Sequence, residues 1–388
     1  MEHIQDKHTL FSGSKLTVKL IIGILFVMLF ITTFLTKPHS TSFAITNLAE
    51  QSRKQAAVSP SFDLIGHVEK AGATYPYYEI IVKDNYLIAS DSFELDVLDV
   101  SNPANPNIPL SEFTDFIGSL ALSGNELYSS YAGFSAIFSV LNVSTPTSPS
   151  VITTLNQTTT GWGNHGDIVV HGNYLYGINE DSPLLEVISI ANPAIPTLVT
   201  DLDLPLTGTS MAIEGSSLYI SASGNYLIII DITNPVSPQI IGTYLVGVTA
   251  SDGFVVQDNI AYLVGKKVGI YDVSDPLNPA ELYLYDINGL ESSYKGAALH
   301  ENYLITYEYN GFFSDRTLRL IALDISNPQA PFEATAYPFD NTVFNNGLVY
   351  TIAINGEYVY VGTKGLYVLR FLEGSHTNTN IYLPLIQR

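Results

Sequence analysis

One glycine-rich segment gathers side chains that could do chemistry. Asn156 to Asp167, NQTTTGWGNHGD, holds the chain's single tryptophan, Trp162, close to Asn164, His165 and Asp167. An indole can stack on a sugar or aromatic ring, and glycines allow unusual backbone dihedrals beside it. The segment is therefore a candidate ligand-binding loop, with His165 and Asp167 as acid–base candidates for a hydrolase or lyase. The alternative is a structural loop, in which the tryptophan covers the fold and the aspartate caps a strand.

Other polar residues stand where apolar runs begin or end. Three pairs are further ligand-binding candidates, or parts of a solvated surface: Tyr78-Glu79, Ser251-Asp252 and Tyr294-Lys295. Two acidic segments, 179–181 and 314–316, could hold Ca²⁺, but neither has the twelve-residue ligand spacing of a calcium loop. The sequence therefore predicts no metal and no cofactor.

The sequence contains no recognised catalytic signature. His-Glu-x-x-His, Gly-x-Ser-x-Gly and a glycine-rich phosphate loop before a helix are all missing from it. His165, His171 and His300 lack metal-site spacing, and the latter two occupy the same position in two repeats, which favours a structural role. No catalytic residue is assigned.

The elements that must position these residues form a repeat. An apolar hexapeptide returns at intervals of about 45 residues, a period typical of propellers and solenoids. The seven copies are LDVLDV from Leu95, FSVLNV from Phe138, LEVISI from Leu185, LIIIDI from Leu227, VGIYDV from Val268, LIALDI from Leu320 and LYVLRF from Leu366. Because both pleat faces are apolar, each copy predicts a strand covered on both sides, as neighbouring blades would cover it.

Turn signals flank each hexapeptide. Its fifth residue is a short polar one in six copies, which can bond the following backbone N–H groups and start a turn. Proline pairs follow at Pro103/Pro106, Pro146/Pro149, Pro193/Pro196, Pro235/Pro238, Pro276/Pro279 and Pro328/Pro331. Their register with the strand ends favours turns over ligands of SH3-like domains. Upstream, pairs such as Gly172-Asn173 and Asp84-Asn85 predict tight hairpins.

Each unit therefore holds four antiparallel strands, and the predicted fold is an all-β, seven-bladed β-propeller. The last copy lacks a proline turn and an outer strand. Phe62 to Val68, FDLIGHV, is similar to the outer strand QIIGTY from Gln239 to Tyr244. We therefore expect this N-terminal strand to complete the last blade and close the ring, leaving no open edge.

The unit L-x-V-[ILY]-D-[VI]-[ST]-[ND]-P resembles the LVIVD-repeat family of secreted or surface bacterial proteins. The likeness covers about residues 62–374. The resemblance implies a β-propeller and an extracellular address, and it brings no catalytic motif.

The ends of the chain indicate export. Within residues 1–44, lysines precede the apolar run Leu20 to Leu35, and Ser42-Phe43-Ala44 fits a cleavage site. A signal peptide and a retained N-terminal anchor both remain open, because the run is shorter than the about 20 residues of a membrane span. Cysteine is absent, which excludes disulfides. Residues 45–61 are a linker, and 375–388 form a polar spacer with an apolar tail similar to tails of some secreted bacterial proteins. This tail could also pack on the side of the propeller.

The charge limits the partners. Asp and Glu number 37 against 16 Lys and Arg, a net charge of −21, which repels nucleic acid and anionic membranes. We therefore predict a non-enzymatic extracellular or cell-surface module that presents variable loops to a protein or glycan, with membrane contact only through an uncleaved N-terminal segment. An extracellular hydrolase or lyase at the channel mouth is the alternative, and an architectural role in an envelope assembly is the third.

Overall fold

The computed structural model describes residues 59–70, 76–91, 94–114, 118–130, 137–156, 165–179, 182–248, 253–286, 292–310, 317–339 and 351–374. These ranges fall within one of two compact units, Ser59–Ser375. The predicted targeting segment, the C-terminal tail, Glu180, Asp181 and the segment 314–316 lie outside them. No helix of the described ranges is long and apolar enough to cross a membrane.

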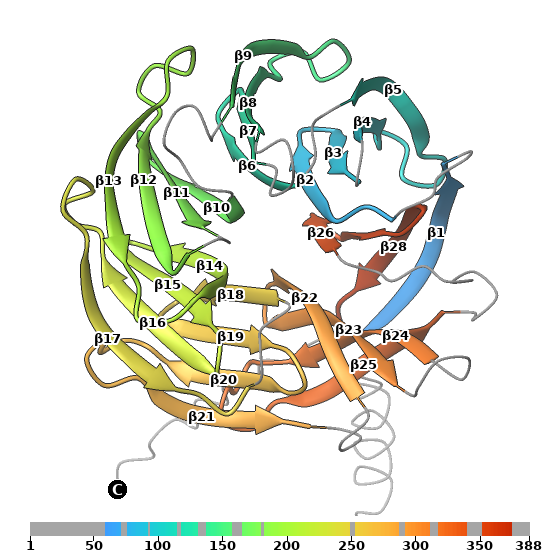
Figure 1. Cartoon of the computed structure of the whole chain (residues 1–388). Helices are drawn as coiled ribbons and strands as arrows, with labels where there is room; N and C mark the ends of the chain where they lie inside the picture. Colours follow the sequence, from blue (N-terminus) through green and yellow to red (C-terminus); the bar gives the residue numbers. More distant parts are fainter. Residues whose placement is uncertain are drawn as a thin grey trace, which may run out of the picture. The chain divides into compact units, whose positions relative to one another are not determined.

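The described chain folds as a seven-bladed β-propeller, with seven four-stranded antiparallel sheets in a ring (Figure 1). Blade 1 consists of β2 (Glu79–Lys83), β3 (Tyr86–Ser90), β4 (Glu94–Asp99) and β5 (Asn107–Thr114). Blade 2 consists of β6 (Ser119–Ser123), β7 (Glu126–Ser130), β8 (Ile137–Asn142) and β9 (Ser150–Asn156). Blade 3 consists of β10 (His165–His171), β11 (Tyr174–Asn179), β12 (Leu184–Ser189) and β13 (Thr197–Asp203).

Blade 4 consists of β14 (Gly208–Glu214), β15 (Ser217–Ala222), β16 (Tyr226–Asp231) and β17 (Gln239–Leu245). Blade 5 consists of β18 (Gly253–Gln257), β19 (Ile260–Val264), β20 (Val268–Asp272) and β21 (Ala280–Tyr285). Blade 6 consists of β22 (Ser292–His300), β23 (Tyr303–Asn310), β24 (Thr317–Asp324) and β25 (Phe332–Pro338). Blade 7 consists of β26 (Thr351–Asn355), β27 (Tyr358–Gly362), β28 (Gly365–Leu372) and β1 (Ser61–Glu69).

The hexapeptides form the third strand of each blade, and their two faces bury against different neighbours. In blade 1, Leu95 and Val97 pack in a cluster with residues of blade 2. Leu98 and Val100, from the opposite pleat face, pack in a cluster with residues of blade 7. The ring is therefore held by apolar contacts between blades, which confirms the burial predicted from the two-sided apolar pattern.

The hairpins between first and second strands share one backbone feature at their first turn residue, and in blade 5 the second turn residue, Asn259, also has a positive φ. Their first turn residue has a positive φ in every blade, at Asp84, Gly124, Gly172, Gly215, Asp258, Glu301 and Gly356. The second turn residue's carbonyl accepts a bond from the sixth hexapeptide residue, as when Val100 N–H donates to Asn85 (2.9 Å). Glycine and aspartate adopt this conformation at little cost, whereas Glu301 does so against its steric preference.

The proline pairs lie in β-turns, as predicted. In each of the six, the residue before the first proline accepts a backbone bond from the residue three further on, as from Asn105 to Asn102 (2.9 Å). The polar fifth residue of the hexapeptide caps the turn, as where Ser101 N–H donates to Asp99 Oδ1 (2.8 Å). These bonds from Ser101 lower the pKa of Asp99.

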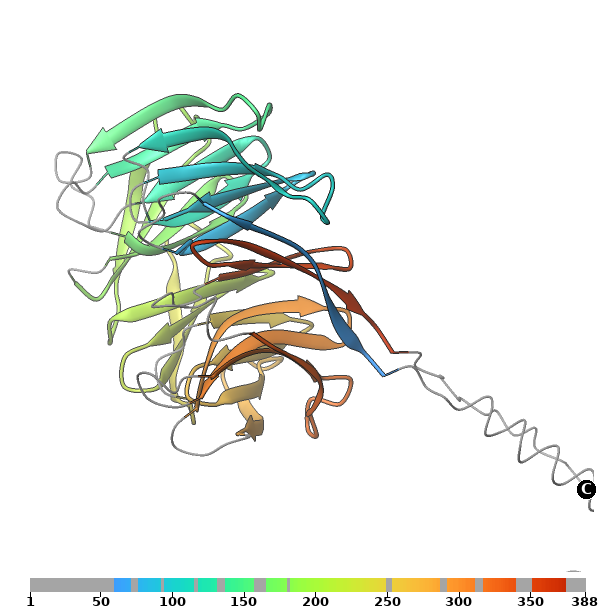
Figure 2. The ribbon, with the colours of Figure 1, turned by 90° about the vertical axis from the view of Figure 1, so that its right-hand side faces the viewer.

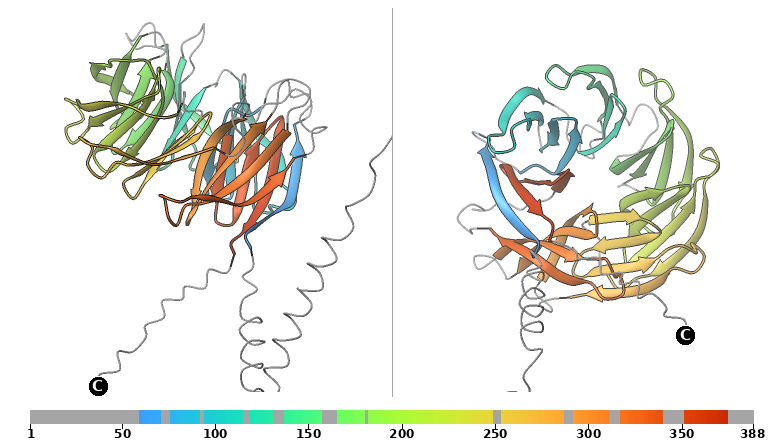
Figure 3. Two further views of the ribbon diagram at one scale, coloured as in Figure 1. Left: turned by 90° about the horizontal axis from the view of Figure 1, so that it is seen from below. Right: turned by 180° about the vertical axis from the view of Figure 1, so that it is seen from behind.

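The N-terminal strand closes the ring. β1 pairs antiparallel with β28, with Ser61 opposite Leu372 and Glu69 opposite Gly365, so the first and last described strands lie side by side (Figures 1 and 3). Its register shifts between Leu64 and Gly66, as the outer strand β17 shifts around Ile241. A Cβ at Gly66 would lie 2.1 Å from the Pro103 carbonyl oxygen of blade 1. The prediction that an N-terminal strand completes the last blade is thus confirmed.

The ring has two unlike faces, and Figure 2 shows it turned by 90° from the view of Figure 1. We call the face with the hairpins and proline turns the lower face. The upper face carries the connections between second and third strands and those between successive blades. The first strand of each blade is innermost and contacts the first strands of the next blades. Residues at the upper ends of these strands therefore meet at the centre of the ring.

Candidate functional site

Three side chains join innermost strands of successive blades at the upper face. Leu120 N–H of β6 donates to Glu79 Oε2 of β2 (2.8 Å). Ile168 N–H of β10 donates to Ser119 Oγ (3.2 Å), and Met211 N–H of β14 donates to Asp167 Oδ2 (2.6 Å). Glu79, Ser119 and Asp167 occupy the same repeat position, just before the first apolar residue of the inner strand. We call them the latch residues, because each satisfies a backbone donor of the next blade.

The two carboxyl groups of the latch are close to one serine. Ser119 Oγ donates to Asp167 Oδ1 (3.1 Å), and it also hydrogen-bonds with Glu79. Burial raises the pKa of Glu79 to about 8, with a further contribution from the charge of Asp167. Burial also raises the pKa of Asp167 to about 6, against the bonds from Met211 and Ser119. Near neutral pH the pair therefore holds one negative charge, and Glu79 is the group that keeps its proton.

The latch series stops at blade 4. Ser210, the equivalent residue, has a buried Oγ without a hydrogen-bond partner among the described residues, and Gly253 and Gly296 follow in blades 5 and 6. A cavity of about 380 Å³ opens at this point between blades 3 and 4. Its walls are Gly166, Asp167, Ile178, Thr207, Gly208 and Thr209. One carboxylate, one aliphatic side chain and exposed glycine backbone thus meet around a single hollow.

His165 forms a buried cluster in blade 3. Its side chain is fully buried, and Nε2 lies 2.6 Å from Glu186 Oε2. Asn179 Nδ2 donates to the other carboxylate oxygen (3.2 Å). The imidazole lies against Gly177, where a Cβ would come within 2.4 Å of the ring. Blade 3 therefore holds the His165 side chain in the interior, where the imidazole contacts Glu186. The imidazole has no exposed surface that a ligand could contact.

A second cluster, in blade 1, surrounds Lys70, which directly follows the closing strand. Lys70 Nζ lies 3.2 Å from Asp91, 2.6 Å from Glu94 and 2.6 Å from Asp96. Tyr77 Oη donates to Asp96 Oδ2 (2.6 Å). Burial lowers the pKa of Lys70, but the bonds to Asp96 and Glu94 outweigh this and raise it above its ordinary value. Lys70 is therefore a charged ammonium that fixes the end of blade 7 to blade 1.

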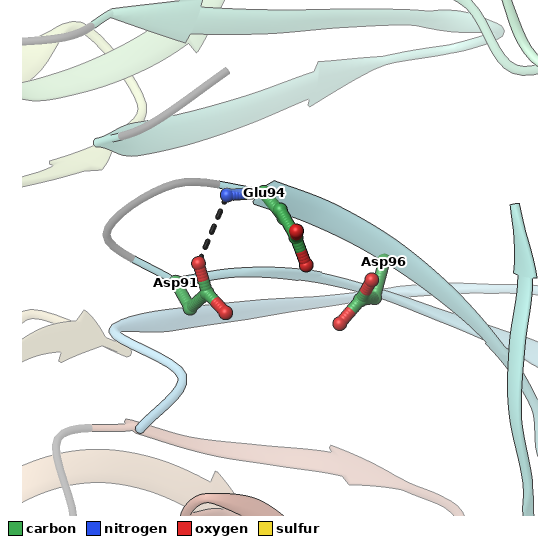
Figure 4. Close-up of side chains that lie close together, drawn as sticks. All are labelled: Asp91, Glu94 and Asp96. Carbon is green, nitrogen blue, oxygen red and sulfur yellow. Dashed lines mark hydrogen bonds between the residues drawn. The ribbon is translucent and has the colours of Figure 1, made fainter. Parts of the chain in front are cut away.

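Three carboxylates of this cluster could serve as metal ligands. Asp91, Glu94 and Asp96 each offer an oxygen within 4.8 Å of the others, and Glu94 N–H donates to Asp91 Oδ1 (Figure 4). Oxygen ligands of this kind suit Ca²⁺. The Lys70 ammonium already contacts all three carboxylates, so a cation would have to displace it.

A third cluster has the same chemistry in blade 6. Arg319 donates to Glu308 and, through Nη1, to Glu333 (2.9 Å). Glu308 and Asp91 occupy the same repeat position, as does Asn179. Blades 1, 3 and 6 therefore each pair a buried acid at the upper face with a cationic or imidazole side chain. The acid lies on the third strand in blades 1 and 3 (Asp96 and Glu186) and on the second strand in blade 6 (Glu308).

Comparisons place the repeat in a family. The family model described as the LVIVD repeat matches residues 78–113, 162–203, 208–246 and 312–338. The chain is an LVIVD-repeat protein. No curated protein matches its sequence. The LVIVD-repeat propeller is similar to the crystal structure of the computationally designed Ika8 protein, with a TM-score of 0.53 and 12% identity. The match covers 79% of this chain and 99% of Ika8, and at this identity it shows the fold alone.

The structure brings only some of the site residues predicted from the sequence together. Glu79 and Asp167 come together, and Tyr78, which precedes Glu79 in the sequence, is 38% exposed. Trp162, Asn164 and Asp252 lie outside the described residues. Tyr294 and Lys295 belong to β22, but their side chains are outside what the structure describes.

Two buried acidic residues that lie within the repeated hexapeptide were not predicted from the sequence. Asp96 and Glu186 occupy the second hexapeptide position, where other copies carry Ser139, Ile228, Gly269, Ile321 and Tyr367. A charged residue inside a strand that is apolar on both sides was the available signal, because buried carboxylates need a partner.

Proposed function

We propose that this LVIVD-repeat protein is a non-enzymatic, extracellular or cell-surface binding module. Its upper face would be presented to a protein or glycan partner. The observation that supports this proposal most strongly is that the two faces of the propeller differ: one is repetitive and the other varies from blade to blade. The lower face repeats one hairpin and one proline turn, whereas the upper face carries the latch residues, the three buried clusters and the 380 Å³ cavity. A rigid scaffold with one variable face is typical of recognition modules.

The bonding of the polar groups favours binding over turnover. Glu79 and Asp167 each accept a backbone N–H of the next blade, and Glu186 and Asp96 are engaged by His165 and Lys70. Such groups hold the face in one shape, which lowers the entropic cost of binding a partner. The extracellular address is supported by the lysines and the apolar run at the N-terminus.

A binding screen tests this proposal. The compact unit Ser59–Ser375 has its own core and closed ring, so it can be used against glycan and envelope-protein panels, with and without Ca²⁺. We expect saturable binding that is lost when the upper face is blocked, for instance by biotin–streptavidin attached at Asp203→Cys. The same attachment on the lower face, at Ser237→Cys, should leave binding unchanged. Equal loss from both attachments, or no saturable ligand, contradicts the proposal.

An extracellular hydrolase or lyase is the second candidate. One observation favours it: Glu79 and Asp167 are two acids of unequal pKa on either side of one hydroxyl, as acid–base catalysis requires. Turnover of any glycan or ester, with a bell-shaped pH profile that Glu79→Gln distorts, would support this candidate over binding alone.

A further inference from the structure

Two acids of the upper face, Asp167 and Glu79, differ from the others in what they contact. Asp96, Glu186 and Glu308 each have a lysine, histidine or arginine of this chain as partner. The bonds that the structure gives to Asp167 come instead from neutral donors, Met211 N–H and Ser119 Oγ. Asp167 is also the acid that borders the cavity between blades 3 and 4.

The lining of the cavity suits one kind of ligand. Asp167 contributes a carboxylate and the exposed Gly166 contributes backbone, while the buried residues Ile178 and Gly208 form the apolar part of the lining. Gly208 cannot acquire a side chain, because a Cβ there would lie 2.8 Å from both Ile178 and Ile220. An apolar wall ending at an anion matches a flexible aliphatic stem that carries a positive charge. The volume is near the lower limit of ligand pockets, so it admits a side chain rather than a folded element.

We propose that this cavity takes a lysine side chain of a protein partner, with the ammonium against Asp167 and the stem along Ile178. The inference rests on the proposed binding function, since it assigns a partner chemistry to the same face. The net charge of −21 supports it, because an acidic module attracts basic partners over distance.

The groups around Asp167 set the expected pH dependence. Glu79 of β2 and Ser119 of β6 approach it from the two preceding blades, and the backbone of β14 donates to it. His165 of its own strand is engaged by Glu186. Because burial raises the pKa of Asp167 to about 6, the carboxylate is mostly ionised at pH 7.5 and mostly protonated at pH 5. Lysine binding should therefore weaken about tenfold between these two pH values.

Titration of the full-length chain with short peptides tests the proposal. Acetyl-Gly-Lys-Gly-amide is the probe, and the norleucine peptide, which keeps the stem but not the charge, is its matched control. We expect the lysine peptide to bind at least tenfold more tightly in calorimetry or NMR titration. Equal binding of the two peptides, or none by the lysine peptide, overturns the proposal. n-Butylammonium binding as tightly as the lysine peptide would assign the cavity to free amines instead, and would also overturn it.

Variants locate the effect. Asp167→Asn keeps the shape of the side chain and an acceptor for Met211 N–H, and it should weaken lysine-peptide binding at least tenfold. Asp201→Asn makes the same charge change at an exposed residue of β13 and should have no effect. Thr207→Arg fills the cavity from an exposed position and leaves all three latch residues unchanged in sequence, so it should abolish binding even if Asp167→Asn misfolds.

Two results would separate this inference from the proposed function. A protein or glycan found in the screen that binds wild type and the Thr207→Arg variant equally well overturns the lysine cavity but leaves the binding module in place. Lysine-specific binding that both variants leave unchanged also overturns it.

Discussion

Replacing Phe62 with alanine should weaken the whole ring, because this side chain anchors the strand that closes it. Phe62 is 8% exposed, and its ring lies 5.0 Å from that of Phe371, centroid to centroid. Phe371 in turn contacts the ring of Tyr303 in blade 6. Removing a buried phenylalanine costs about 3–5 kcal/mol in a rigid core, and we expect about 3 kcal/mol here because an edge strand can relax into part of the cavity.

The chain offers a matched control on another outer strand. Phe332, in β25, is 56% exposed, so the same substitution there should change the free energy of unfolding by at most about 0.5 kcal/mol. At about 2 °C per kcal/mol for a domain of this size, the melting midpoint should fall by roughly 6 °C for Phe62→Ala and by about 1 °C or less for Phe332→Ala. Calorimetry measures both.

A stronger form of the test removes the strand. A chain lacking residues 59–69 should melt at a lower temperature with a broader transition, or associate through the exposed edge of β28. If this shortened chain melts at the same midpoint and with the same sharpness, or if the two phenylalanine substitutions are equivalent, the ring is not closed by β1.

Three further predictions concern charged residues. Lys70→Met leaves the carboxylates of its cluster without their cation. Because the Lys70 side chain is only 10% exposed, the substitution should lower the free energy of unfolding by about 3 kcal/mol, measured by denaturant titration. A loss below about 0.5 kcal/mol would show that the cluster contributes nothing. Glu301→Gly relieves the backbone strain of a left-handed residue (φ 49°) and should raise the free energy of unfolding by about 1 kcal/mol. Glu357→Gly, at the second residue of a hairpin turn, should not raise it. Equal effects of the two substitutions contradict the strain argument. Finally, because burial raises the pKa of Glu79 from 4.5 to about 8, the folded state binds its proton more tightly than the unfolded state, so stability falls as pH rises through that window. Glu79→Gln should flatten the change in melting midpoint between pH 5 and pH 8, and an unchanged slope would refute the assignment.

Much of the site could not be predicted because its residues are far apart in the sequence, as the latch residues illustrate. Glu79, Ser119 and Asp167 are separated by some forty residues each, and only their shared repeat position relates them. The sequence indicated Glu79 and Asp167 as candidates, but not that both would approach Ser119, since this depends on the spacing of adjacent blades. His165 shows the opposite case. Its glycine-rich neighbours predicted an accessible loop, yet the imidazole is buried because Gly177 leaves room for it and Glu186 faces it.

The amino-acid sequence by itself determined the blades, their number and the closing strand, because each is encoded locally by alternating apolar residues, hairpin pairs and proline turns. The likeness of residues 62–68 to an outer strand predicted that this segment completes the last blade, whereas its register against β28 came from the structure. Only the tertiary structure decided which polar groups meet, since ionic and hydrogen-bonded partners such as Lys70 and Asp96 come from different blades. Their pairing depends on distances of a few ångströms that no local pattern specifies.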